Sequence, residues 1–394
     1  MPPRLRPLLP RLVMGLTVAA SLLGATELTL RVAYGPPSPP VLLVAEGFAS
    51  GRPFTVSRGM VTVEYQKGDA IDPFPLQPTP GVPRVLVFGG SSVHGGSHLD
   101  YREEFPGLVE TLLGAQDRPI EVLNLAQPGR DSNSTRPVLA EALAFQPALV
   151  VFYMGHNDLG NTIMQARYPG VRGALEARIT VLMQRSKIHE MLAAGLHSEL
   201  LTAQQMAEPW AMPPLTEAQR VMAAGLFERN LVWMTEQIHA VGGEAILVTP
   251  ISDMTLKPRV GATEADQAAL KNPHRYDLAT LDAALQAEPD RPDLLWIRGS
   301  QRMDARDPRG CDDLRRASDL DPRPLHASEA MADALRAAAA ESGARLVDLR
   351  AEVLQKHCIP PKEWFLDEVH LSREGHEQVA AILAPAVAEV LAGR

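Results

Sequence analysis

The stretch Val85-Leu-Val-Phe-Gly-Gly-Ser-Ser92 decides the fold class. Four consecutive apolar residues, Val85 to Phe88, predict a short buried strand, and the glycine pair after them predicts a turn. Glycine also lets the backbone approach a bound molecule closely. The stretch therefore predicts a buried strand that presents Ser91 at its carboxyl end, in a sterically open position.

Four more apolar runs along the chain predict strands, and segments with helical spacing separate them. The runs are residues 120–125, 148–154, 244–249 and 344–349, and the expected helices cover 105–113, 136–144, 229–241, 327–342 and 374–391. Alternating strands and helices are typical of a parallel sheet with helices on both faces. We therefore expect a three-layer α/β/α sandwich around a mostly parallel five-stranded sheet.

Three candidate site residues follow the first three predicted strands. Ser91 follows the first strand, Gly129 the second and Asn157 the third. In parallel sheets the functional site lies beyond the carboxyl ends of the strands. The three positions should therefore meet at one edge of the sheet.

The N-terminus has the features of a targeting segment. Arg4, Arg6 and Arg11 precede an apolar run at residues 12–25, and residues 27–33 are still fairly apolar. A basic region followed by an apolar run is typical of a signal peptide or signal anchor, although a buried core helix is an alternative. We expect an extracytoplasmic protein, periplasmic or secreted, that is attached to a membrane through this segment.

The rest of the chain divides into a lead-in and one interrupted domain. Residues 34–83 are rich in proline and glycine, contain short β-like runs such as residues 60–65, and predict a linker or irregular lead-in. Residues 84–392 are expected to form the main domain. Helical insertions are expected at residues 161–225 and 253–326. In the second insertion, Gly299, Ala317 and Asp321-Pro322 resemble a tetratricopeptide repeat, but barely one and a half repeats fit where about three are needed for a free-standing array. An ordinary helical hairpin that leans on the main domain is the alternative, and a protein partner of these helices is conceivable.

Charge and cysteine content narrow the function further. The formal net charge is −9, which gives a nucleic-acid partner no electrostatic support. Cys311 and Cys358 belong to no ligand cluster, so we expect neither a metal nor a cofactor. In an exported protein the two cysteines could pair, but the sequence does not give their distance, and we expect two unpaired thiols.

Asp367 and His370 supply the remaining groups that a serine nucleophile needs. A serine hydroxyl requires a base to accept its proton, and a carboxylate three residues before a histidine can orient the imidazole. The oxyanion that forms during acyl transfer needs hydrogen-bond donors. The backbone N–H groups of Ser91 and Gly129 and the side-chain amide of Asn157 are candidates.

These residues make the chain resemble the SGNH/GDSL hydrolase superfamily. Four blocks match in order: Gly89-Gly90-Ser91 with Gly95, Asn124 to Gly129, Gly155-His156-Asn157-Asp158, and Asp367 with His370. The resemblance implies Ser91 as nucleophile, His370 as base, Asp367 as its partner, and Ser91, Gly129 and Asn157 as oxyanion donors. Gly90 replaces the aspartate of the family's first block, which leaves catalytic efficiency open.

Several alternatives remain at this point. His94, His98 and His156 are expected to line the site, and His376 to lie on a helix surface, because none has an acid at triad-like spacing. These residues predict a serine esterase, and the resemblance implies a small acyl group on a carbohydrate or similar alcohol as its substrate. The same residues would serve an O-acyltransferase, and a catalytically weak scaffold with a partner-binding insertion is a third possibility.

Overall fold

The computed structural model of the chain describes residues 21–33, 54–63, 73–94, 99–164, 188, 214–260, 274 and 276–393. It divides into two compact units, one from residues 1–41 and 171–200 and the other from residues 42–170 and 201–394. In the first unit, residues 21–33 form a helix, and the basic residues expected to begin a targeting segment lie outside the described part. Within the described residues, no helix combines the length and the apolar character needed to cross a membrane.

A five-stranded parallel sheet forms the centre of the second unit. Its strand order is β5-β4-β6-β7-β8, and every neighbouring pair is parallel. The strands are β4 (Arg84–Gly89), β5 (Glu121–Asn124), β6 (Leu149–Tyr153), β7 (Glu244–Val248) and β8 (Arg345–Val347). The five apolar runs are therefore the five strands, and the predicted fold class is confirmed.

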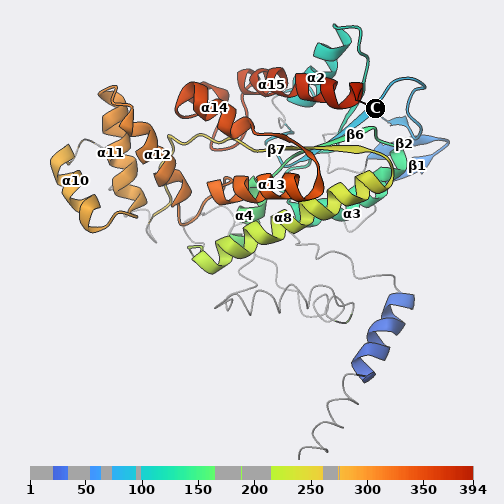
Figure 1. Cartoon of the computed structure of the whole chain (residues 1–394), viewed down its shortest axis with the longest axis horizontal. Helices are drawn as coiled ribbons and strands as arrows, with labels where there is room; N and C mark the ends of the chain where they lie inside the picture. Colours follow the sequence, from blue (N-terminus) through green and yellow to red (C-terminus); the bar gives the residue numbers. More distant parts are fainter. Residues whose placement is uncertain are drawn as a thin grey trace, which may run out of the picture. The chain divides into compact units, whose positions relative to one another are not determined.

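Helices cover both faces of this sheet, as Figure 1 shows. Because successive side chains of a strand point to opposite faces, Leu86 and Phe88 pack on one side and Val85 and Val87 on the other. The first face is covered by α3 (Ser132–Ala142), α8 (Glu217–Ala240) and α13 (Glu329–Ser342). The second is covered by α2 (Phe105–Gly114), α14 (Leu349–His357) and α15 (Arg373–Ala392). The strands are buried on both faces, which explains their continuous apolar sequences.

Part of the expected lead-in is ordered structure, and the prediction of a linker is wrong there. The strands β1 (Phe54–Ser57), β2 (Met60–Val63) and β3 (Phe74–Pro75) form a small antiparallel sheet. Phe54 and Phe74 pack edge-on against Phe145, with ring centroids 4.8 and 5.3 Å apart. The buried Arg84 donates hydrogen bonds to the carbonyl groups of Pro75 and Leu76. Apolar burial and these bonds attach the segment to the domain.

The first predicted insertion, residues 161–225, lies mostly outside the described residues. On its two sides, α4 (His156–Met164) follows β6, and α8 begins at Glu217, twelve residues earlier than the helix expected at 229. Thr216 and Gln219 form a capping box that fixes this start.

The second predicted insertion contains three helices: α10 (Leu278–Ala287), α11 (Pro292–Asp304) and α12 (Arg309–Asp319). They enclose a separate apolar cluster, which also includes Ile359 from the segment after α14. A Cβ atom on Gly299 would lie 2.9 Å from Leu314 Cγ, so the glycine allows α11 and α12 to approach closely. The helices therefore pack on the main domain, as expected for either a hairpin or a repeat-like insertion.

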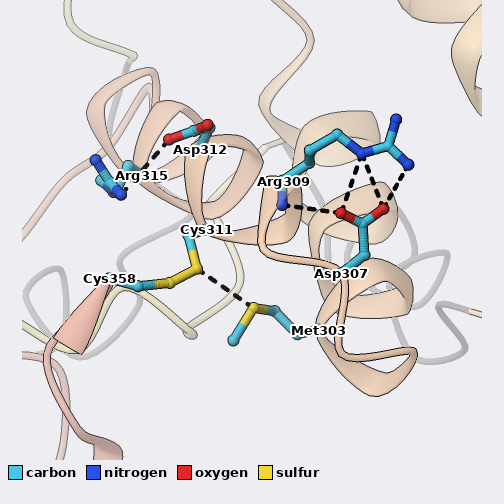
Figure 2. The surroundings of a disulfide bond; sticks show 7 residues. All are labelled: Met303, Asp307, Arg309, Cys311, Asp312, Arg315 and Cys358. Carbon is cyan, nitrogen blue, oxygen red and sulfur yellow. Dashed lines mark hydrogen bonds and ion pairs between the residues drawn. A yellow bond between two sulfur atoms is a disulfide. The ribbon is translucent and has the colours of Figure 1, made fainter.

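Cys311 and Cys358 form a disulfide, so the prediction of two unpaired thiols is wrong (Figure 2). Cys311 lies near the start of α12, and Cys358 directly follows α14. The fold brings their Cα atoms to 5.9 Å although the residues are 47 positions apart. The sulfur of Met303 lies 3.6 Å from that of Cys311. The bond links the insertion covalently to the segment that leads to Asp367.

Candidate active site

The structure brings Ser91, His370 and Asp367 together in a hydrogen-bonded chain. His370 Nε2 lies 2.7 Å from Ser91 Oγ, and His370 Nδ1 lies 2.6 Å from Asp367 Oδ2. Ser91 follows β4, whereas the other two residues lie in the loop before α15. The imidazole is thus placed between a hydroxyl that can lose a proton and a carboxylate that can stabilise the charged ring.

The loop from Asp367 to His370 is closed by its own hydrogen bonds. Asp367 Oδ1 accepts from the backbone N–H groups of Val369 at 3.0 Å and His370 at 2.9 Å. The Leu366 N–H donates to the His370 carbonyl at 2.8 Å. Partial burial raises the pKa of Asp367, but the hydrogen bonds from the His370 ring and from the two N–H groups outweigh it and lower the pKa to about 2. The carboxylate is therefore ionised at neutral pH.

Asn157 lies in the first turn of α4 and covers the turn that precedes Ser91. Its Nδ2 donates to the Arg130 carbonyl at 2.9 Å. A Cβ atom on Gly90 would lie 2.3 Å from the same nitrogen. The loops after β4, β5 and β6 therefore meet at this amide, as the sequence predicted. An amide nitrogen carries two hydrogens, so the bond to Arg130 leaves a second one for another acceptor.

Gly129 adopts a backbone conformation that favours glycine, with φ of 73°. Asn161 Nδ2 donates to the Gly129 carbonyl at 3.3 Å and to Asp131 Oδ2 at 2.8 Å, which holds this loop against α4. Within the described residues, neither the Gly129 nor the Ser91 backbone N–H has a hydrogen-bond acceptor. Both donors are therefore available to a substrate.

Asp158, directly after Asn157, attaches α4 to the start of α3. Its Oδ1 accepts from the Ser132 N–H at 3.0 Å and from the Ser132 hydroxyl, and Asn230 donates to that hydroxyl at 2.8 Å. Burial, with the nearby charge of Asp131, raises the pKa of Asp158 to about 7. Asp158 thus holds the start of α4 against the start of α3.

The other histidines near the site have different environments. His156 is buried, accepts a hydrogen bond from the Ala327 N–H at 3.0 Å, and has a pKa lowered to about 3 by burial and by the charge of His326. His376 is also buried and accepts from the Phe105 N–H at 3.1 Å, so its predicted place on a helix surface is wrong. Burial lowers the pKa of His376 to about 4. His94 lies 3.7 Å from Glu104, and His98 is outside the described residues.

Glu368 is the residue beside the site that the sequence analysis missed. Its buried carboxylate is bound by His326 Nδ1 and by both terminal nitrogens of Arg259, which belong to the second insertion. These partners are 42 and 109 residues away in sequence. A charged residue inside the Asp-Glu-Val-His block was the one available signal.

In the part of the chain that the structure describes, no three His, Cys, Asp or Glu side chains are grouped so as to hold a metal ion. The groups at the site are a hydroxyl, an imidazole, a carboxylate and hydrogen-bond donors. This set can perform acyl transfer through a covalent intermediate.

Comparison of the sequence with known protein families shows which family the chain belongs to. The model of the GDSL-like lipase/acylhydrolase family matches residues 87–334, which is more than half of the chain. The chain belongs to this family. It is therefore an ester hydrolase of the SGNH/GDSL type, and the predicted enzyme class is confirmed. The match includes Ser91, Gly129 and Asn157 and ends before Asp367 and His370.

Several solved structures resemble this SGNH/GDSL hydrolase at low sequence identity. TesA is 15% identical with a TM-score of 0.39, over 78% of this chain and 99% of its own. A lipase/acylhydrolase from Enterococcus faecalis is 14% identical with a TM-score of 0.38, over 78% and 95%. A GDSL-like lipase from Bacteroides thetaiotaomicron is 13% identical with a TM-score of 0.37, over 79% and 91%. No curated protein sequence matches the chain.

Proposed function

We propose that Ser91, His370 and Asp367 act as nucleophile, general base and orienting acid of this ester hydrolase. The observation that supports the assignment is the chain of two short contacts, 2.7 Å from Ser91 to His370 and 2.6 Å from His370 to Asp367. Both lie within the distance over which protons are transferred between heavy atoms.

In the first half of the proposed reaction, Ser91 Oγ attacks the carbonyl carbon of the ester. The Ser91 proton passes to His370 Nε2, and the negative charge moves to the former carbonyl oxygen. The N–H groups of Ser91 and Gly129 and the free amide hydrogen of Asn157 would stabilise this oxyanion. When the tetrahedral intermediate collapses, the bond to the alcohol oxygen breaks, and His370 returns the proton to the leaving alcohol.

In the second half, water replaces the alcohol. His370 accepts a proton from water, the hydroxide attacks the acyl carbon, and the bond to Ser91 Oγ breaks as the serine regains its proton. Asp367 stays ionised throughout, because its pKa is far below neutral, and stabilises the charged imidazole. Acyl groups therefore leave as carboxylic acids.

We propose a small acyl group on a carbohydrate or similar alcohol as the substrate. Support comes from the accessibility of the site, since the side chains of His370 and Asp367 are 39% and 57% exposed. A bulky alcohol can approach such a site, and water can enter it freely. The same exposure favours hydrolysis over acyl transfer to a second alcohol, because transfer requires water to be kept away from the acyl-enzyme.

The decisive activity test is Ser91→Ala in the full chain, with p-nitrophenyl acetate as substrate. We expect kcat to fall by about 10⁴-fold, because the nucleophile is removed. Ser92→Ala is the matched control, since Ser92 is a buried neighbouring serine that contacts neither His370 nor Asp367. If Ser91→Ala keeps full activity, or if Ser92→Ala shows the larger loss, the assignment is wrong.

We also propose that the protein functions outside the cytoplasm, attached through its N-terminal segment. The basic residues before the apolar run at 12–25 support export, and the Cys311–Cys358 disulfide is of a kind that persists in oxidising compartments. Fractionation of expressing cells, with thiols titrated under denaturing conditions, tests this. Recovery from the cytoplasm with two free thiols would contradict it.

A further inference from the structure

We propose that Glu368 is a positioning residue through which the second insertion holds the proposed catalytic loop in place. The inference rests on the proposed function of Asp367 and His370, which flank Glu368 in the chain. Asp367 and His370 lie beside Ser91, whereas Glu368 turns inward and its side chain is 9% exposed. Phe365 and Leu371 hold the two ends of the loop in the apolar core, and Glu368 attaches its middle to the second insertion.

Both ends of the insertion bind this one residue. At its beginning, the Asp253 N–H donates to the Glu368 carbonyl at 2.9 Å. At its end, the Leu325 N–H donates to Glu368 Oε1 at 3.3 Å, and His326 Nδ1 binds the same oxygen. The insertion thus forms hydrogen bonds with both the backbone and the side chain of Glu368.

Arg259 adds a two-pronged ion pair from within the insertion. Its Nη1 donates to Glu368 Oε1 at 3.2 Å, and its Nη2 binds Oε2. The backbone N–H of Arg259 donates to Asp321 Oδ1 at 3.0 Å, which fixes Arg259 itself. Paired hydrogen bonds between guanidinium and carboxylate fix direction as well as distance, so they constrain the orientation of Glu368.

An ionised Glu368 complements the two cationic groups that bind its carboxylate. Both ring nitrogens of His326 have acceptors, with Nε2 at 3.1 Å from the Ser318 carbonyl, as a charged imidazolium requires. Two cations, Arg259 and His326, then face two carboxylates, Glu368 and Asp321. Removing the Glu368 charge would leave His326 without its carboxylate partner and Arg259 with Asp321 alone, so we expect the loop to move.

A small displacement of this loop is sufficient to impair catalysis. Proton transfer depends on the 2.7 Å contact between His370 and Ser91, and a shift of about 1 Å at a catalytic group costs about 100-fold in rate. The effect should fall on kcat, because the Glu368 carboxylate is buried and its oxygens are bound by other groups of the protein.

The test compares Glu368→Gln with Asp313→Asn in the full chain. Asp313 is the matched control: it is a buried carboxylate in the same insertion, bound by Arg298 at 2.6 Å and Arg302 at 2.8 Å, but away from the catalytic loop. Active sites are first counted by labelling with a serine-directed phosphonate, and kcat and KM for p-nitrophenyl acetate are then expressed per labelled site. This removes any misfolded fraction from the comparison.

We expect Glu368→Gln to lower kcat per labelled site by about 10- to 100-fold with KM nearly unchanged. Asp313→Asn should lower thermal stability but leave kcat per labelled site within about twofold of wild type. Unchanged kcat per site in Glu368→Gln would overturn the inference, as would an equal loss in Asp313→Asn. Absence of labelling and activity in the wild type would instead refute the proposed function.

Arg259→Lys provides a second variant in case Glu368→Gln fails to fold. Lysine keeps the positive charge but cannot form the paired contacts, so the loop should be held less firmly. We expect kcat per labelled site to fall in the same direction but less than in Glu368→Gln. A kcat equal to that of wild type would count against the role of the Arg259 contact.

Discussion

Asp158 and Glu368 are two buried carboxylates that each directly follow a proposed site residue, Asn157 and Asp367. Asp158 is held by neutral hydrogen bonds from Ser132, and burial raises its pKa to about 7. Burial alone would also raise the pKa of Glu368, but the hydrogen bonds and charges of His326 and Arg259 reverse the shift and leave it well below its ordinary range. One half of the site is anchored by hydrogen bonds and the other by ion pairs.

The difference reflects what each half is attached to. The loops of Ser91, Gly129 and Asn157 follow neighbouring strands, so the sheet places them and short hydrogen bonds suffice. The loop of Asp367 and His370 follows no strand directly and depends on residues from the second insertion. We call the loops of Ser91, Gly129 and Asn157 the sheet half of the site. We expect the sheet half to keep its geometry when residues of the insertion are changed, whereas the loop of Asp367 and His370 should be displaced.

Among the changes in the sheet half, Asn157→Ala should cause the largest loss of activity. We expect kcat to fall by about 10²- to 10³-fold, because one of three oxyanion donors is lost. KM and thermal stability should change little, since the Asn157 side chain makes a single hydrogen bond within the protein. Steady-state kinetics with p-nitrophenyl acetate and a thermal melt measure both effects. A fall of less than about twofold would remove Asn157 from the proposed oxyanion site.

Gly90→Asp restores the residue type of the family's first block, yet we expect it to reduce activity. Any Cβ atom at position 90 would lie 2.3 Å from Asn157 Nδ2, so the amide must move away. The loss in kcat should approach that of Asn157→Ala, by about 10- to 100-fold. The double variant should be no worse than Asn157→Ala alone, because both changes act on the same donor. Improved activity in Gly90→Asp would contradict this packing argument.

Asp158→Asn should have the smallest effect on activity and should alter the pH dependence of stability. The folded pKa of about 7 exceeds an unfolded value of about 3.9, so the folded state binds more protons between these values and stability falls as pH rises through them. Asparagine keeps an oxygen acceptor for Ser132 and has no charge to bury. The melting temperature of the variant should therefore no longer fall between pH 4 and 8 as it does in the wild type. The same pH profile in both proteins would contradict the raised pKa of Asp158.

The contribution of Glu368 to stability should depend on pH in the opposite direction. Its folded pKa is lowered, so its contribution to stability is present above an unfolded value of about 4.3 and is lost as pH falls through the folded pKa. Asp158→Asn should leave this loss at acidic pH intact.

The sheet half of the site was predictable from sequence because its signals are local. Each of these three residues follows closely after an apolar run, so the order of strands and loops is enough to predict Ser91, Gly129 and Asn157 at one edge of the sheet. Asp367 and His370 were recognised as a pair because they are only three positions apart in the sequence. The β-like run at residues 60–65 was visible in the sequence and contains β2, but the surrounding prolines and glycines gave no sign that this segment packs on the domain.

Long-range contacts account for what sequence could not show. The bonds of Glu368 to Arg259 and His326 join residues that only the folded insertion brings together. His376 has no apolar sequence signal for its burial, which arises from packing of α15 against α2. For Cys311 and Cys358 a signal existed, since an even number of cysteines in an exported chain favours pairing, but it gives no distance.

Covalent labelling tests the central assignment most directly. The purified full chain is treated with a serine-directed phosphonate, digested, and the modified residue is located by mass spectrometry. The proposed assignment requires one label on Ser91, slow labelling in His370→Ala, where the base is lost, and none in Ser91→Ala. Labelling at Ser92 or another serine, or an unchanged rate in His370→Ala, would contradict it.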